Sequence, residues 1–139
     1  MDRNVQLRLQ GAMTTGYVHH AECSLHDMGT RHPECPARLD AIHDHLLASG
    51  LLDHLFDVTA PVATREHLER VHDARYLDCV QAIAPQRGVV HLDPDTAMGP
   101  HSHQAALRAA GAVIKAIDMV LAGEIENAFC SVSPPGHYA

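Results

Sequence analysis

The sequence predicts an α/β domain with a mainly parallel β-sheet that is flanked by helices, and three observations lead to this fold class. Short segments with β propensity alternate with longer segments of helical periodicity, which is the order of parallel βαβ units. The segment 127–132 reads as a buried strand. The helical segment 101–121 is apolar around most of its circumference, so it needs neighbours on several sides, as the cover of a parallel sheet has.

The first elements of the chain are expected to be one strand and one helix. Residues 1–12 form a loose leader, and a strand follows at 14–19, where Thr, Tyr and Val have high β propensity. A polar loop is expected over 22–36. Pro36 suits the first turn of a helix, and this helix is expected to end at Ser49-Gly50, where glycine can follow the last turn.

The rest of the chain continues the alternation of strands and helices. The elements expected there are a strand at 56–59, a helical region from Thr64 to about Ala84, a short extended or loop segment at 89–92, a rigid acidic loop at 93–100, the long helix at 101–121 and a last strand at 127–132. Thr64 can accept a hydrogen bond from the first helical turn. The 139 residues therefore correspond to one domain or to a large piece of one.

Composition and charge exclude several classes of protein. The chain carries 10 Lys and Arg against 17 Asp and Glu, a net charge of −7, so we expect no binding to nucleic acid through its phosphates. No run approaches the roughly 20 apolar residues that span a bilayer, so we expect no membrane association. The N-terminus lacks the apolar region of a secretory signal, which predicts a cytoplasmic protein with reduced cysteines. The alternative for the thiols is a structural zinc site made by Cys23, His26, His32 and Cys35.

Two places carry candidate chemistry. The last strand leads into the turn Pro134-Pro135-Gly136, which presents His137 beyond the carboxyl end of the strand, where α/β sheets form their sites. His137 can be a general base, a general acid or a metal ligand, or it can cap the turn. Asp95 in the acidic loop is the second candidate, although Asp beside proline is often a turn residue only. Most of the other histidines, of 13 in the chain, are interpreted as surface or capping residues.

Several motifs occur along the chain in one order. They are His32 to Leu39 (HPECPARL), Val71 to Asp73 (VHD), Leu92 to Thr96 (LDPDT), Ala109 to Gly111 (AAG), Ala122 to Phe129 (AGEIENAF) and Pro134 to His137 (PPGH). Their order and spacing resemble the histone deacetylase family, and more closely its bacterial class II-like deacetylases and acetylpolyamine amidohydrolases. The resemblance covers about 14–139. It implies the arginase–deacetylase fold and zinc-dependent hydrolysis of an N-acyl amide, such as acetyl-lysine or an acetylated amine.

The resemblance also implies roles for individual residues. His137 matches the first histidine of the family's tandem pair, which manages protons, and Asp95 matches a loop carboxylate that hydrogen-bonds the substrate backbone. Three positions depart from the family pattern: Ser133 and Cys35 stand where relatives carry Arg, and Tyr138 replaces the second histidine, the usual general base. Tyrosine, whose ordinary pKa is about 10, is a poor base at neutral pH.

One main hypothesis and two alternatives follow. The family's zinc ligands lie downstream of the PPGH motif, so we expect residues 1–139 to be a truncated, N-terminal portion of a deacetylase-like domain. Zinc is expected for the complete domain, whereas this chain alone should bind none and be inactive. We expect self-association or a complementing chain, because an incomplete sheet exposes its last strand. The alternatives are a non-catalytic binding or assembly module with a deacetylase-derived fold, and a metal-binding protein that uses the histidines.

Overall fold

Three parallel strands form the central sheet of the computed structural model, which describes residues 2, 4–6, 14–29 and 32–136. The strands are β1 (Thr15–His19), β2 (Leu55–Thr59) and β5 (Asn127–Ser131), and their order across the sheet is β2-β1-β5. Both edge strands run parallel to the central one. The predicted strands at 14–19, 56–59 and 127–132 are therefore confirmed to within one residue at each end. The expectation that the last strand is buried is wrong, because β5 lies at an edge of the sheet and Asn127 and Phe129 are exposed.

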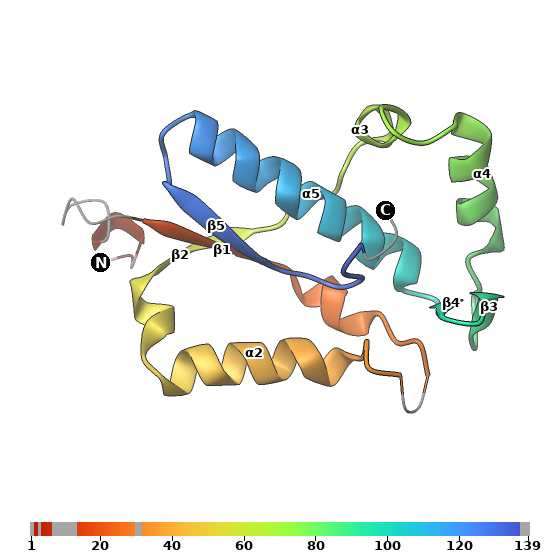
Figure 1. Ribbon diagram of the computed structural model, residues 1–139, viewed down its shortest axis with the longest axis horizontal. Coiled ribbons are helices and arrows are strands. Elements are labelled where there is room, and N and C mark those ends of the chain that lie inside the picture. The colour runs from red at the N-terminus through yellow and green to blue at the C-terminus, as the bar shows by residue number, and fades with distance from the viewer. Residues whose placement is uncertain (1, 3, 7–13, 30–31, 137–139) are drawn as a thin grey trace.

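Helices cover both faces of this sheet. Successive side chains of a strand point to opposite faces. On β1, Val18 packs in a core cluster with residues of α5 (Ser102–Leu121), whereas the neighbouring Tyr17 ring stacks near His43 of α2 (Pro36–Ala48). Figure 1 shows α5 and α2 on opposite sides of the strands. The predicted α/β fold, with a parallel sheet between helices, is thus confirmed.

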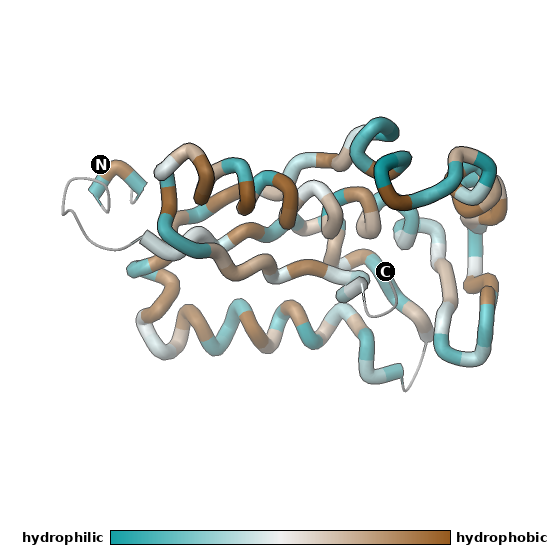
Figure 2. The backbone as a smooth tube through the Cα atoms, turned by 45° about the horizontal axis from the view of Figure 1, so that its top comes forward, coloured by the Kyte–Doolittle hydropathy of each residue, from teal (hydrophilic) through white to brown (hydrophobic). Residues whose placement is uncertain are grey.

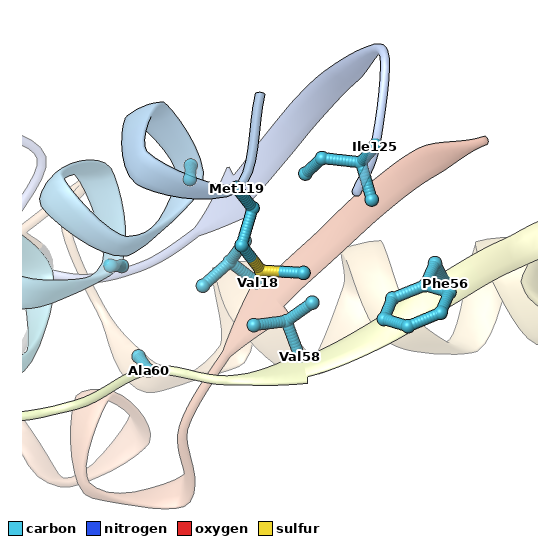
Figure 3. Close-up of a cluster of buried hydrophobic side chains, with 8 residues drawn as sticks. Val18, Phe56, Val58, Ala60, Met119 and Ile125 are labelled. Atoms are coloured by element: carbon cyan, nitrogen blue, oxygen red, sulfur yellow. The ribbon is translucent and has the colours of Figure 1, made fainter. Parts of the chain in front are cut away.

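The hydrophobic core lies between α5 and the sheet. Its buried members come from β1, β2, α5 and the turn before β5, and Figure 3 shows Val58, Val18 and Met119 pointing toward one another. The cluster consists of Val18, Phe56, Val58, Ala60, Ala112, Ala116, Met119 and Ile125. The small α5 members bring that helix close to the strands. Apolar burial of this kind stabilises the fold by roughly 25 cal/mol per Å² removed from water.

The segments around α2 contain more regular structure than the sequence predicts. The loop expected over 22–36 includes a 3-10 helix, η1 (Ala21–Leu25), and a second 3-10 helix, η2 (Leu51–His54), follows α2. Gly50 between α2 and η2 has a φ of 74°, a left-handed conformation that glycine adopts without steric cost. Hydrophobic and hydrophilic residues alternate along α2 in Figure 2, which agrees with its position as a covering helix at the surface.

The single helical region expected from Thr64 to about Ala84 is wrong, because the structure has two helices there. These are α3 (Arg65–Glu69) and α4 (Ala74–Ile83). Thr64 caps α3 as predicted, since its side chain accepts from the His67 amide. The first helix ends at Glu69, and the Asp73 side chain then accepts from the Arg75 amide and starts a new one. Figure 1 shows α4 standing away from the central sheet.

The expected acidic loop at 93–100 is also wrong in part. Strands β3 (Val90–Asp93) and β4 (Thr96–Met98) form an antiparallel hairpin. The Asp93 carboxylate accepts from the Asp95 amide at 2.8 Å and fixes the turn between them. Of the predicted leader, residues 4–6 form a short helical turn. Within the described part of the chain, no helix is long and apolar enough to cross a membrane.

Candidate functional site

The carboxyl end of β5 leads directly into the candidate site. The segment Ser133–Gly136 follows the strand, and the Ser133 side chain is only 1% exposed. Its hydroxyl donates to the Glu34 carboxylate, which belongs to the loop before α2. A residue 99 positions earlier in the chain therefore anchors the start of the turn. His137 and Tyr138, the two catalytic candidates, lie outside the described residues.

The ion pair between Glu34 and Arg38 holds the residues that lead into this turn. Arg38 of α2 donates to both carboxylate oxygens of Glu34, at 3.0 and 3.1 Å, and to the Val132 carbonyl at 2.8 Å. Such a two-pronged arrangement is strong and directional. Glu34 also accepts from Ser133, so the ion pair contacts both residues that follow β5, Val132 through Arg38 and Ser133 through Glu34. The network holds the backbone from which residue 137 continues.

A buried histidine, His26, lies against the start of α5. His26 is 3% exposed, and its Nδ1 lies 2.7 Å from the Ser102 hydroxyl at the start of α5. Burial lowers the pKa of His26, so the ring is neutral at neutral pH. Among the described residues, its Nε2 has no hydrogen-bond partner. The Ser102 oxygen also accepts from the Gly99 amide, which ties the hairpin to α5.

Two adjoining cavities, of about 650 and 760 Å³, open beside the turn. Both are lined by the segment Pro134–Gly136, by Tyr76 of α4 and by His103 of α5. The walls are mostly apolar, which is typical of a site that binds a small molecule or takes up another segment of polypeptide. His26, Glu34 and Arg38 belong to the wall of the larger one.

Asp95 also lines the larger cavity. The residue is exposed at the hairpin turn, where its amide donates to Asp93. That hydrogen bond holds the pKa of the Asp93 carboxyl below its ordinary value. The structure therefore brings the two regions that the sequence singles out, the Asp95 turn and the Pro-Pro-Gly turn, to one cavity.

The zinc ion that the family resemblance implies does not fit the described residues. In 14–29 and 32–136, no three His, Cys, Asp or Glu side chains come together in a way that could hold a metal ion. The alternative zinc site of Cys23, His26, His32 and Cys35 is therefore wrong, and His26 binds Ser102 instead. Burial raises the pKa of the Cys23 thiol, so this side chain is protonated and behaves as a small apolar group.

The sequence reasoning missed the groups that support the turn. Glu34 and Arg38 are four residues apart at the start of a helix, a spacing that indicates an ion pair. Their contacts with Val132 and Ser133 could not be predicted, because nothing local in the sequence links them. The His26–Ser102 contact could not be predicted for the same reason, because the two residues are 76 positions apart in the sequence.

Comparison with known proteins gives a consistent result. The family described as "Histone deacetylase domain" matches residues 32–139. The chain is 42% identical over 106 residues to a histone deacetylase-like amidohydrolase of Pseudomonas aeruginosa, which covers 76% of this chain and 27% of the relative. It is 34% identical over 142 residues to polyamine deacetylase HDAC10 of Mus musculus, covering 91% of this chain and 20% of the relative.

The solved structures agree with the sequence comparison. The HDA15 HD domain matches with a TM-score of 0.82 and 29% identity, over 90% of this chain and 38% of that chain. The chain spans between a fifth and about a third of the length of the first curated relatives it matches. The family match covers more than half of the residues and the folds agree, which confirms the resemblance drawn from the motifs: this chain belongs to the histone deacetylase family.

Proposed function

We propose that the chain forms the N-terminal part of a zinc-dependent amidohydrolase that cleaves N-acetyl amides, with acetyl-lysine or an acetylated amine as substrate. The observation that carries this proposal is the single cavity lined by both the Asp95 turn and the Pro134–Gly136 turn. Family membership gives the cavity its chemistry. We place the protein in the cytoplasm.

The residues of this chain take two roles in the proposed reaction. His137, which follows Gly136 directly in the sequence, acts as the proton-transferring residue. The Asp95 carboxylate, exposed on the cavity wall, accepts a hydrogen bond from the substrate amide. Glu34 and Arg38 hold the backbone that leads to His137. Zinc, held by other residues of a complete domain, supplies Lewis-acid chemistry when bound.

We propose further that these 139 residues alone do not hydrolyse amides. Tyr138 stands where the family pattern has its general base, and a tyrosine is mostly protonated at pH 7 because its ordinary pKa is about 10. The matched relatives are also several times longer than this chain. The rest of a family domain, in the same polypeptide or in a complementing one, would complete the site.

A fusion protein tests this function. The chain is joined to the part of the Pseudomonas aeruginosa relative that follows the matched segment, and hydrolysis of an acetyl-lysine peptide is measured with zinc and with a chelator. We expect zinc-dependent activity from the fusion and none from the isolated chain. Tyr138→His should raise the fusion's kcat by about 100-fold, as a restored general base does. Asp95→Asn should lower kcat/KM by about tenfold, as the loss of a charged hydrogen bond does.

Two results would contradict the proposal. The first is zinc-dependent deacetylation by the isolated chain, which would show that the site is complete without further residues. The second is a folded fusion that binds zinc but stays inactive even with Tyr138→His. Glu66→Gln is a matched control, because Glu66 pairs with Arg70 at the exposed surface and neither residue lines either cavity. This variant should leave the rate of the fusion unchanged.

A non-catalytic binding or assembly module is the second candidate, and exposed apolar residues favour it. Phe129 on edge strand β5 is 45% exposed, and Leu121 at the end of α5 is 81% exposed. A surface of this kind is typical of an interface. We therefore expect the isolated chain to self-associate, which sedimentation velocity measures. A monomer across the accessible concentration range that also binds no hydrophobic dye would contradict this candidate.

A further inference from the structure

The two edge strands of the central sheet, β2 and β5, differ in how their outward-facing backbone groups are hydrogen-bonded. In a parallel strand, both backbone groups of one residue point to one neighbour, and those of the next residue point to the other side. On β2, the Ala60 amide after the strand donates to His19 of β1, so even-numbered positions face β1. Asp57, at the middle of the strand, faces outward.

Asn4 occupies that outward position. Its side-chain amide donates to the Asp57 carbonyl at 3.0 Å, and its side-chain oxygen accepts from the Asp57 amide at 2.9 Å. These are the two hydrogen bonds that a residue of an added strand would form. A new strand could therefore not cross the centre of β2 without displacing Asn4.

The surroundings strengthen this contact. The Asp2 carboxylate accepts from the backbone amide of Asn4 at 2.9 Å, and the Asp2 carbonyl accepts from the backbone amides of Val5 and Gln6. The turn that carries Asn4 is thus held in shape by its own first residue. The Asp57 side chain, 46% exposed and 2.8 Å from His19, adds a charge to the same edge, and charged side chains disfavour edge-to-edge pairing.

We propose that the Asn4 side chain closes the outer edge of β2 against pairing with a second copy of this chain. The described residues place no strand on the outer side of β5, so pairing of the central sheet with a second copy is directed to the β5 edge. This device belongs to the chain itself and does not depend on the proposed enzymatic function. It lies in a segment before residue 32, where the family match begins.

Hydrogen exchange of the isolated chain tests the proposal. In Asn4→Ala, the Asp57 amide should exchange about fivefold faster at low protein concentration, the factor that corresponds to one lost hydrogen bond of about 1 kcal/mol. As concentration rises, β2 amides should become protected in the variant only, while β5 behaves as in the unchanged chain. Asn4→Leu should act in the same way, because a leucine side chain of similar size can neither donate to the Asp57 carbonyl nor accept from the Asp57 amide.

Gln6→Ala is the matched control, since Gln6 lies in the same turn and its backbone amide, which the substitution keeps, donates to the Asp2 carbonyl. It should exchange and associate as the unchanged chain does. The proposal fails if the Asp57 amide exchanges as slowly in both Asn4 variants as it does in the unchanged chain. It also fails if exchange accelerates but β2 gains no protection at high concentration, because the contact would then exist without guarding the edge. Circular dichroism confirms that both variants are folded.

Discussion

His26 shows how one buried side chain connects three separate segments. It lies after η1, contacts Ser102 at the start of α5 and borders the cavity of the candidate site. The Ser102 oxygen also accepts from the Gly99 amide, so Ser102 links His26 to the residue that follows β4. From the sequence, this histidine was a zinc-ligand candidate only. Its actual role needed the contact with Ser102, which no local pattern encodes.

The burial of His26 predicts a specific dependence of stability on pH. Its pKa in the folded chain lies below the ordinary value of about 6.5 for histidine. As the pH falls below about 6.5, the unfolded chain takes up this proton first, so the free energy of unfolding should fall. Above that pH the effect is absent. In His26→Gln the loss between pH 7.5 and 5.5 should be smaller, as measured by urea unfolding.

The exposed His45 of α2 supplies the control for this measurement. His45→Gln should keep the full loss of stability between the two pH values, because an exposed ring is solvated in both the folded and the unfolded state. Equal pH dependence in the His26 and His45 variants would show that the burial of His26 does not control protonation.

At the level of elements, the predictable part of the fold is the part with strong periodicity or local capping. The strands of the sheet, α2 and α5 follow from apolar patterns and from Pro36, and their observed ends differ little from the expected ones. The break between α3 and α4 was missed because Asp73 competes as a cap within a continuous helical pattern. The β3–β4 hairpin was predicted in part: the segment 89–92 was expected to be extended or a loop, and it largely forms β3, whereas the three residues of β4 were assigned to the acidic loop because so short a segment carries no clear pattern.

The packing of α5 yields a prediction that the sequence alone does not. A Cβ atom at Gly111 would lie 2.0 Å from the Pro61 carbonyl oxygen and 2.9 Å from the Ala63 amide nitrogen. These are backbone atoms of the segment after β2, and the neighbouring Ala63 amide donates to Leu107 of α5. Gly111→Ala should therefore lower the free energy of unfolding by about 3 kcal/mol, as overpacking does. Without the clash, Ala would stabilise a helix interior by about 1 kcal/mol, so a gain in stability on urea unfolding would contradict this contact.

At the scale of the whole molecule, the sequence identified both the family and the fold, whereas the site remained partial. The Asp95 turn and the Pro-Pro-Gly turn come together at one cavity, 39 or more positions apart in the chain. The family resemblance, drawn from the order of the motifs, had implied a role in the reaction for each of these regions. The supporting contacts of Glu34 with Ser133 and of Arg38 with Val132 join residues 99 and 94 positions apart in the sequence, so only the structure shows them.

The central claim is that this chain supplies one part of a deacetylase site that other residues complete. The rate of acetyl-lysine peptide hydrolysis, measured side by side for the isolated chain and for its fusion to the following part of the Pseudomonas aeruginosa relative, tests it most directly. We expect a zinc-dependent rate from the fusion, increased by Tyr138→His, and no rate above buffer from the isolated chain. A zinc-dependent rate from the isolated chain equal to that of the fusion would contradict the claim.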